Sequence, residues 1–138
     1  MESIAAVVPV NTMLISALLV TMKLVLGIRV TMYRASHNIP WGDNGDDQMT
    51  RRIRAHANHS EWVPATLILL ALIEMSGVSP FIIGALGAAL LVGRGLHGLG
   101  LMGNAEAFNR VTGITMHWIV LALAVIIAVV QFFAPGSF

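Results

Sequence analysis

A stripe of polar side chains leads directly into an apolar run in the middle of this chain. The apolar run covers residues 62–73. The four polar residues that precede it are Arg51, Arg54, Asn58 and Glu61. Their spacing of i, i+3, i+7 and i+10 places them on one helical face. Guanidinium groups bind carboxylates and phosphates through paired hydrogen bonds. The stripe therefore indicates a binding site for an anionic ligand at a membrane boundary.

Basic residues of the next two apolar runs extend this pattern. Arg94 and His97 are three residues apart and share a helical face, and Arg110 stands at the start of the last run. Only one carboxylate, Glu61, is embedded near these cations, and it can neutralise one arginine. The surplus of positive charge favours an anionic ligand. The alternative is a structural role, in which arginines at helix ends set the topology and bind lipid head groups.

Composition limits the remaining possibilities. The chain has 138 residues, of which 57% are hydrophobic and 11% charged, whereas about 25% are charged in a soluble domain. These values indicate a single-domain integral membrane protein, and a net charge of +1 gives no reason to expect a nucleic-acid partner. The chain has no cysteine, so it has no thiol nucleophile. His56 and His59 lack a third ligand at a suitable spacing, and we predict no metal site.

The apolar runs predict an all-α protein in which residues 1–138 form one bundle of four transmembrane helices. About 20 apolar residues span a bilayer, and the expected helices cover residues 4–28, 48–75, 80–102 and 111–134. Lys23 lies within two turns of the first run's end and is expected to reach the interface. Asp46 or Asp47 is expected to cap the second helix. The third is rich in glycine and alanine, which predicts close packing against its neighbours.

The distribution of arginine predicts the orientation in the membrane. The connection after the first run and the start of the second contain most of the arginines, and Arg94 and Arg110 flank the connection after the third. The turn between the second and third runs and both termini contain neither lysine nor arginine. Because basic loops face the cytoplasm, we expect both termini on the non-cytoplasmic side.

These residues resemble a known family, the membrane-associated proteins in eicosanoid and glutathione metabolism (MAPEG). The family motif at the start of the second helix reads here Arg51-x-x-Arg54-Ala55-His56-x-Asn58-x-x-Glu61-x-x-Pro64. The Arg-x-x-His of the third helix is Arg94-Gly95-Leu96-His97, and an arginine at the start of the fourth helix is Arg110. The resemblance covers the whole chain, including its length and its four apolar runs.

The resemblance implies a homotrimer that binds glutathione between subunits near the cytoplasmic face. The residues that match the family's glutathione-binding positions are Arg51, Arg54, His56, Asn58, Glu61, Arg94 and His97. Arg110 matches the arginine that stabilises the glutathione thiolate, so it is the expected catalytic residue. The implied function is that of a glutathione-dependent membrane transferase or peroxidase, which conjugates or reduces lipophilic electrophiles from the bilayer.

The chain also departs from part of the family. Members similar to the microsomal prostaglandin E synthase have a tyrosine four positions after the third-helix histidine and a serine after the fourth-helix arginine. Leu101 and Val111 occupy these positions here, so prostaglandin synthesis is not expected. The family also contains non-catalytic members. The alternative function is therefore a membrane protein that binds a lipid or an anionic ligand without chemistry.

Overall fold

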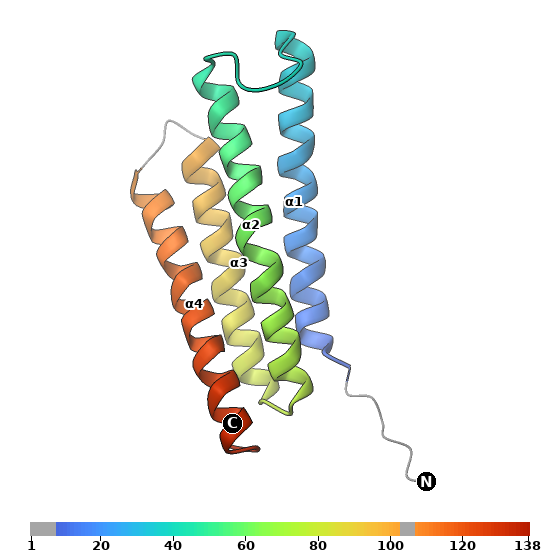
Figure 1. Cartoon of the computed structure of the whole chain (residues 1–138), viewed down its shortest axis with the longest axis vertical. Coiled ribbons are helices and arrows are strands. Elements are labelled where there is room, and N and C mark those ends of the chain that lie inside the picture. The colour runs from blue at the N-terminus through green and yellow to red at the C-terminus, as the bar shows by residue number, and fades with distance from the viewer. Residues whose placement is uncertain (1–7, 103–106) are drawn as a thin grey trace.

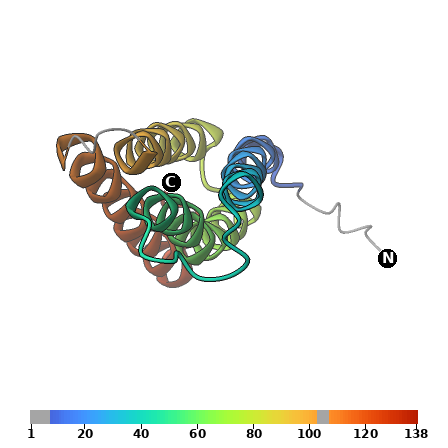
Figure 2. The same ribbon diagram turned by 90° about the horizontal axis from the view of Figure 1, so that it is seen from above.

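The chain forms four antiparallel α-helices, as the computed structural model shows for residues 8–102 and 107–138 (Figure 1). The helices are α1 (Val10–His37), α2 (Asp47–Met75), α3 (Pro80–Met102) and α4 (Ala107–Phe133). α1 and α4 lie on opposite sides of the bundle, and each contacts both α2 and α3 (Figure 2). The helices enclose an apolar core of fully buried side chains that includes Leu19, Leu70, Ile83, Leu90 and Ala124.

Three of these helices, α1, α3 and α4, are long and apolar enough to cross a membrane. α2 is just as long, but its first half is the polar segment described above. The apolar surface cannot be accommodated in water, since large side chains such as Leu14, Leu24 and Ile126 are about half exposed or more on the outside of the bundle. The predicted all-α integral membrane fold is confirmed.

Two predicted helix boundaries were wrong. α1 ends at His37, not near residue 28, and α4 begins at Ala107, not at Val111. α1 also begins at Val10, while the predicted start at residue 4 lies outside the described residues. In each case the helix extends beyond the apolar run. A helix continues into water as long as its polar residues favour it, and α1 stops only at Asn38, which adopts the left-handed conformation (φ 52°).

The connection between α1 and α2 is fixed by its own side chains. Asp46 caps α2 as predicted, because its carboxylate accepts a hydrogen bond of 2.8 Å from the backbone N–H of Met49. This bond lowers the pKa of the Asp46 carboxyl. The Tyr33 hydroxyl donates to the same carboxylate, and the Arg34 guanidinium donates to the carbonyl of Gly42. The start of α2, with its arginines, is thereby held against the end of α1.

At the opposite end of the bundle, Glu74 of α2 holds the first turn of α1. Its carboxylate accepts bonds from the backbone N–H groups of Asn11 and Thr12, at 2.9 and 2.8 Å, and from both of their side chains. The residue before α1 is Pro9, which offers no side-chain cap. Glu74 therefore satisfies N–H groups that a capping residue would otherwise satisfy, and its charge suits the positive end of the helix.

Glycines bring α3 and α4 into backbone contact, as the small-residue pattern predicted. A Cβ atom on Gly113 would clash with the His97 nitrogen and would lie 2.5 Å from the Gly93 carbonyl oxygen. A Cβ atom on Gly100 would lie 2.6 Å from the Arg110 nitrogen. Since these contacts involve backbone atoms, no larger residue fits without moving a helix. The contact sets the distance between His97 and Arg110.

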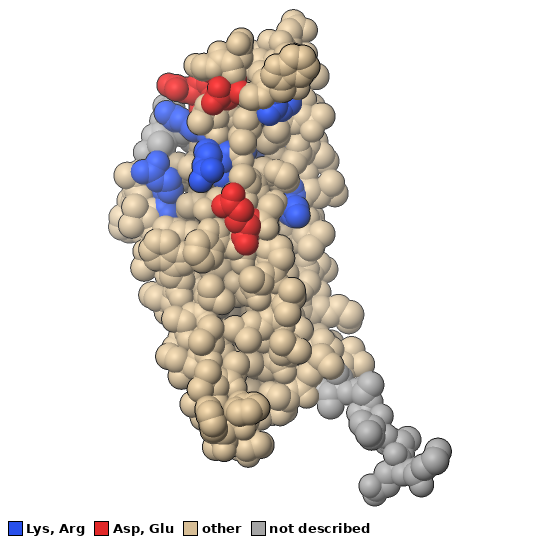
Figure 3. All heavy atoms as spheres, in the orientation of Figure 1, with Lys and Arg blue, Asp and Glu red and all other residues tan. Residues whose placement is uncertain are grey.

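Charged residues gather at one end of the bundle. On the face shown in Figure 3 the Lys, Arg, Asp and Glu side chains occupy the upper half, on the side of the α1–α2 connection, and the lower half shows none. The first turn of α1 and the last turn of α4 lie at the other end (Figure 1). The predicted placement of both termini outside the cytoplasm is compatible with this arrangement and stays a prediction.

Candidate functional site

Arg94 and Asn58 connect the two helices that carry the predicted ligand-binding residues. The Arg94 Nη1 of α3 donates a hydrogen bond of 3.0 Å to the Asn58 Oδ1 of α2. Arg94 is only 1% exposed, and its Nε has no hydrogen-bond partner among the described residues. No carboxylate of the described residues pairs with its charge. A buried cation that lacks a counter-ion is costly, and an anionic ligand would offset that cost.

His97 and Arg110 form the second connection, between α3 and α4. The Nδ1 of His97 lies 3.0 Å from the Arg110 carbonyl oxygen. A carbonyl only accepts, so the His97 Nδ1 carries a hydrogen and donates it to this bond. The Arg110 side chain is exposed and its backbone is fixed by the glycine contact between α3 and α4. The catalytic candidate therefore projects from a rigid backbone.

The remaining residues of the polar stripe lie on the outer surface of α2. Arg51, Arg54 and Glu61 are exposed, while Asn58 and His56 are half-buried. Glu61 is exposed on the single chain, and its pairing with an arginine stays a prediction. Its position ten residues after Arg51 places it on the face of α2 that points away from the other three helices. Of the predicted residues, the structure thus joins Arg94 to Asn58 and His97 to Arg110, while Arg54 and Glu61 lie on the outer surface of α2.

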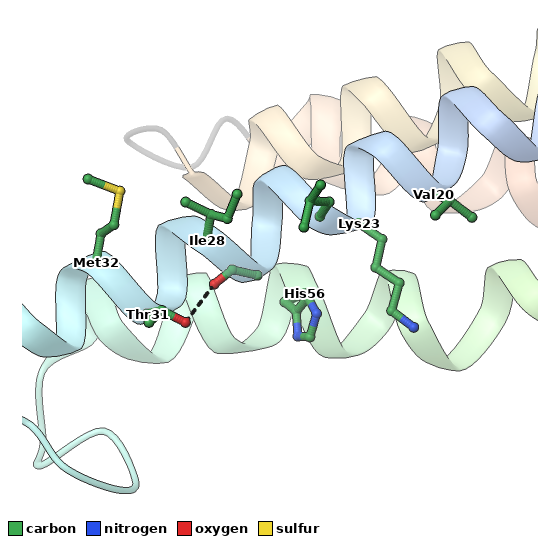
Figure 4. Close-up of a pocket in the computed structure, with 8 residues that line it drawn as sticks. Val20, Lys23, Ile28, Thr31, Met32 and His56 are labelled. Carbon is green, nitrogen blue, oxygen red and sulfur yellow. Dashed lines mark hydrogen bonds between the residues drawn. The ribbon is translucent and has the colours of Figure 1, made fainter.

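His56 faces α1 and not the stripe. Its ring lies beside Gly27, where a Cβ atom would be 3.4 Å from His56 Nε2, and it lines a groove between α1 and α2 (Figure 4). Lys23 lines the same groove and extends toward α2 (Figure 4). Lys23 is half-buried, and its expected reach to the membrane interface stays a prediction.

Two buried histidines, His59 and His117, lie outside the predicted site. The His59 Nε2 donates to the Leu19 carbonyl at 3.0 Å, and the His117 Nε2 lies 2.9 Å from the Thr66 hydroxyl oxygen. The Nδ1 atom of each ring is buried with no partner among the described residues. A histidine within an otherwise apolar span indicates an internal position, and this signal could have singled out His117. It is weaker for His59, which lies in the polar stretch.

The arrangement favours binding of an anion at the charged end of the bundle. Arg94 and Asn58 lie between α2 and α3, Arg51 and Arg54 are exposed on α2, and Arg110 is exposed on α4. Glu61 is a carboxylate on this surface and can accept hydrogen bonds from an ammonium group. A ligand with both carboxylates and an ammonium group fits this combination of charges.

Comparisons with known proteins agree with a membrane-spanning helical bundle. The MAPEG family model matches residues 12–130. The chain is 29% identical over 97 residues to the inner membrane protein YecN of Escherichia coli strain K12, which covers 70% of this chain and 73% of that protein. The same values hold for YecN of E. coli O6:H1 strain CFT073. With most of its length matched by the family model and with four helices of the expected arrangement, the chain belongs to the MAPEG family of membrane proteins.

Proposed function

We propose that the protein is a glutathione-dependent membrane transferase or peroxidase that acts on lipophilic electrophiles. The observation that carries this proposal is the buried Arg94, held by Asn58 and left without a counter-ion among the described residues. Membership of a family in glutathione and eicosanoid metabolism supports it. The absence of cysteine also supports it, because a thiol cofactor supplies the nucleophile that the chain lacks.

Arginines and one carboxylate would bind the cofactor. The glutathione carboxylates pair with guanidinium groups, and its ammonium group pairs with Glu61. The binding residues in this proposal are Arg51, Arg54, Asn58, Glu61, Arg94 and His97, and His56, which faces α1, is not among them. Arg110 stabilises the thiolate, because a guanidinium close to a thiol lowers the pKa of that thiol and raises the fraction of the reactive form. The lipophilic substrate reaches the thiolate from the bilayer, and its proximity to the bound nucleophile accelerates the reaction.

Turnover separates this function from binding without chemistry. Purified protein with glutathione and a small aryl halide should form the conjugate, and Arg110→Ala should lower kcat by about 100-fold, as expected when one group that stabilises a developing anion is removed. Glutathione binding by Arg110→Ala should stay close to wild type. If wild type binds glutathione but converts neither the aryl halide nor a lipid hydroperoxide, the non-catalytic alternative is correct.

We also propose that the protein is a homotrimer in which the outer face of α2 lies at the symmetry axis. The residues of this face are spaced alternately four and three apart, which is the repeat of a helix that packs against parallel copies of itself. They are Asp47, Arg51, Arg54, Asn58, Glu61, Ala65, Ile68, Leu72 and Met75. All of them are exposed except the half-buried Asn58. In its apolar half, Ile68 and Leu72 are 63% and 58% exposed.

A cysteine cross-link tests this interface without background, since the chain has no cysteine of its own. Parallel helices around an axis place copies of one residue at one level, so Ile68→Cys should form disulfide-linked dimers in the membrane under mild oxidation. The matched control is Leu14→Cys on α1, which is equally exposed at 64%. Equal cross-linking of the two variants, or none for Ile68→Cys, contradicts an α2 interface.

A further inference from the structure

Polar side chains from three different helices lie close together inside the bundle. They are His59 of α2, Arg94 of α3 and His117 of α4, which are 1%, 1% and 0% exposed. Arg94 is close enough to both rings for its charge to act on them, and the two rings are also close enough to interact electrostatically. His59 directly follows Asn58, the hydrogen-bond partner of Arg94. The three side chains therefore form one buried polar cluster.

The hydrogen bonds of the two histidines show which ring nitrogen carries the hydrogen. The His59 Nε2 lies 3.0 Å from the Leu19 carbonyl oxygen, which can only accept. The Thr66 hydroxyl donates its one hydrogen to the Trp62 carbonyl at 3.1 Å. The same hydroxyl oxygen therefore accepts from the His117 Nε2, at 2.9 Å. Both rings carry a hydrogen on Nε2.

The opposite nitrogen of each ring is an acceptor that no described residue satisfies. A second positive charge beside Arg94 would be costly, because no carboxylate of the described residues offsets the first, so both rings are neutral. A neutral ring with its hydrogen on Nε2 has a lone pair on Nδ1. The Nδ1 atoms of His59 and His117 and the Nε of Arg94 are buried without a partner among the described residues. Buried polar atoms of this kind require a hydrogen-bond partner.

A small cavity leaves room for such a partner beside His59. Its volume is about 120 Å³, which exceeds the roughly 30 Å³ that one water molecule occupies in the liquid. The polar side chains that line the cavity are His59 and Lys23, and the rest of its wall is apolar. Lys23 also lines the groove between α1 and α2 (Figure 4), so the cavity borders the surface of the bundle.

We propose that this cluster binds ordered water molecules, which hydrogen-bond to the Nδ1 atoms of His59 and His117 and to the Nε of Arg94. Water fits because it donates to the two lone pairs and accepts from the guanidinium group. A metal cation is disfavoured by the charge of Arg94, and an anion is disfavoured by the lone pairs of the rings.

The bound water would also orient Arg94. A water molecule that accepts from Nε limits the rotation of the guanidinium group and solvates its charge inside the bundle. His59 and His117 hold this water and are therefore positioning residues for the anion site at Arg94. The positioning role rests on the proposed function of Arg94, whereas the water site does not.

An X-ray structure at a resolution that shows ordered water tests the site itself. Wild type should have water about 3 Å from the Nδ1 atoms of His59 and His117 and from the Nε of Arg94. His117→Leu should lose the water of that ring, and His117→Gln, which keeps an acceptor, should retain it. The water site is overturned if no water lies at these three atoms, if an imidazole bonds directly to Arg94, or if an ion occupies the position.

The affinity for glutathione tests the positioning role. By isothermal titration calorimetry, His117→Leu should bind glutathione about tenfold more weakly than wild type, the scale of one hydrogen bond to a charged group. His117→Gln should bind like wild type. The matched control is Gln131→Leu, which removes a buried polar group of the same helix whose amide donates to the Ser76 carbonyl at the other end of the bundle. This control should also bind like wild type.

Thermal unfolding of each variant checks that the fold is intact. The positioning role is overturned if His117→Leu binds glutathione like wild type, or if His117→Leu and Gln131→Leu lose affinity equally. A wild-type protein that does not bind glutathione contradicts the proposed function and with it the positioning role, and the water site is then decided by the X-ray structure alone.

Discussion

Glutathione binding by an Arg94→Gln variant should be weaker than that of wild type by about 100-fold, the effect of removing one member of a buried, hydrogen-bonded charge pair. Arg94 is buried at the contact of α2 and α3, bonded to Asn58, and no described carboxylate neutralises it. The glutamine keeps a hydrogen-bond donor for Asn58 but has no charge for the ligand. Isothermal titration calorimetry of the detergent-solubilised protein measures the difference.

A structural role for Arg94 predicts a different result. If Arg94 only connects α2 to α3, the glutamine variant should bind glutathione within a few-fold of wild type, and only its melting temperature should change. Arg29→Gln, which removes an exposed charge away from this site, is the control for general electrostatic attraction and should bind like wild type. Reduced binding by both variants to the same extent would mean that net charge, and not the Arg94 site, determines affinity.

The second large effect concerns stability. Glu74→Gln should lower the free energy of unfolding by about 3 kcal/mol, the scale of losing charged hydrogen bonds and leaving a buried donor unsatisfied. The carboxylate of Glu74 accepts four hydrogen bonds from Asn11 and Thr12. A glutamine has one oxygen, and its NH₂ group would face a donor of α1. Denaturant unfolding in mixed micelles measures the change.

Arg29→Gln is the control for this stability effect, because Arg29 is an exposed charged residue of α1 that lies outside the proposed α2 interface. Its free energy of unfolding should be within about 0.5 kcal/mol of wild type, as is usual for surface substitutions. Equal losses for the two variants would show that the Glu74 bonds to α1 contribute nothing beyond the charge itself.

The number and approximate position of the helices could be predicted because bilayer thickness sets the length of each apolar run. The end of α1 could not, because residues 29–37 are polar enough to leave the membrane and still continue the helix to Asn38. The turn at residues 76–79 and the capping of α2 by an aspartate could be predicted from the local sequence alone. The hydrogen bonds of Glu74 to the first turn of α1 could not be predicted, since its partners are more than 60 residues away in the sequence.

The candidate site was predictable as a set of residues but not as a geometry. Helical spacing placed Arg94 on the face of His97, and the structure gives them different partners, Asn58 on α2 and the Arg110 carbonyl on α4. Spacing also placed Glu61 on the arginine stripe, but it could not show that this stripe points away from the bundle. Which helix face points inward depends on how all four helices pack, and that information is distributed over the whole chain.

Formation of the glutathione thiolate is the measurement that tests the proposed function most directly. Rapid mixing of the purified protein with glutathione at neutral pH, followed by ultraviolet absorbance, detects the thiolate without any assumption about the second substrate. The wild type should give a saturable thiolate signal, and Arg110→Ala should bind glutathione but give little or none. A wild-type protein that binds glutathione at saturation without any thiolate signal would contradict thiolate stabilisation by Arg110 and with it the proposed chemistry.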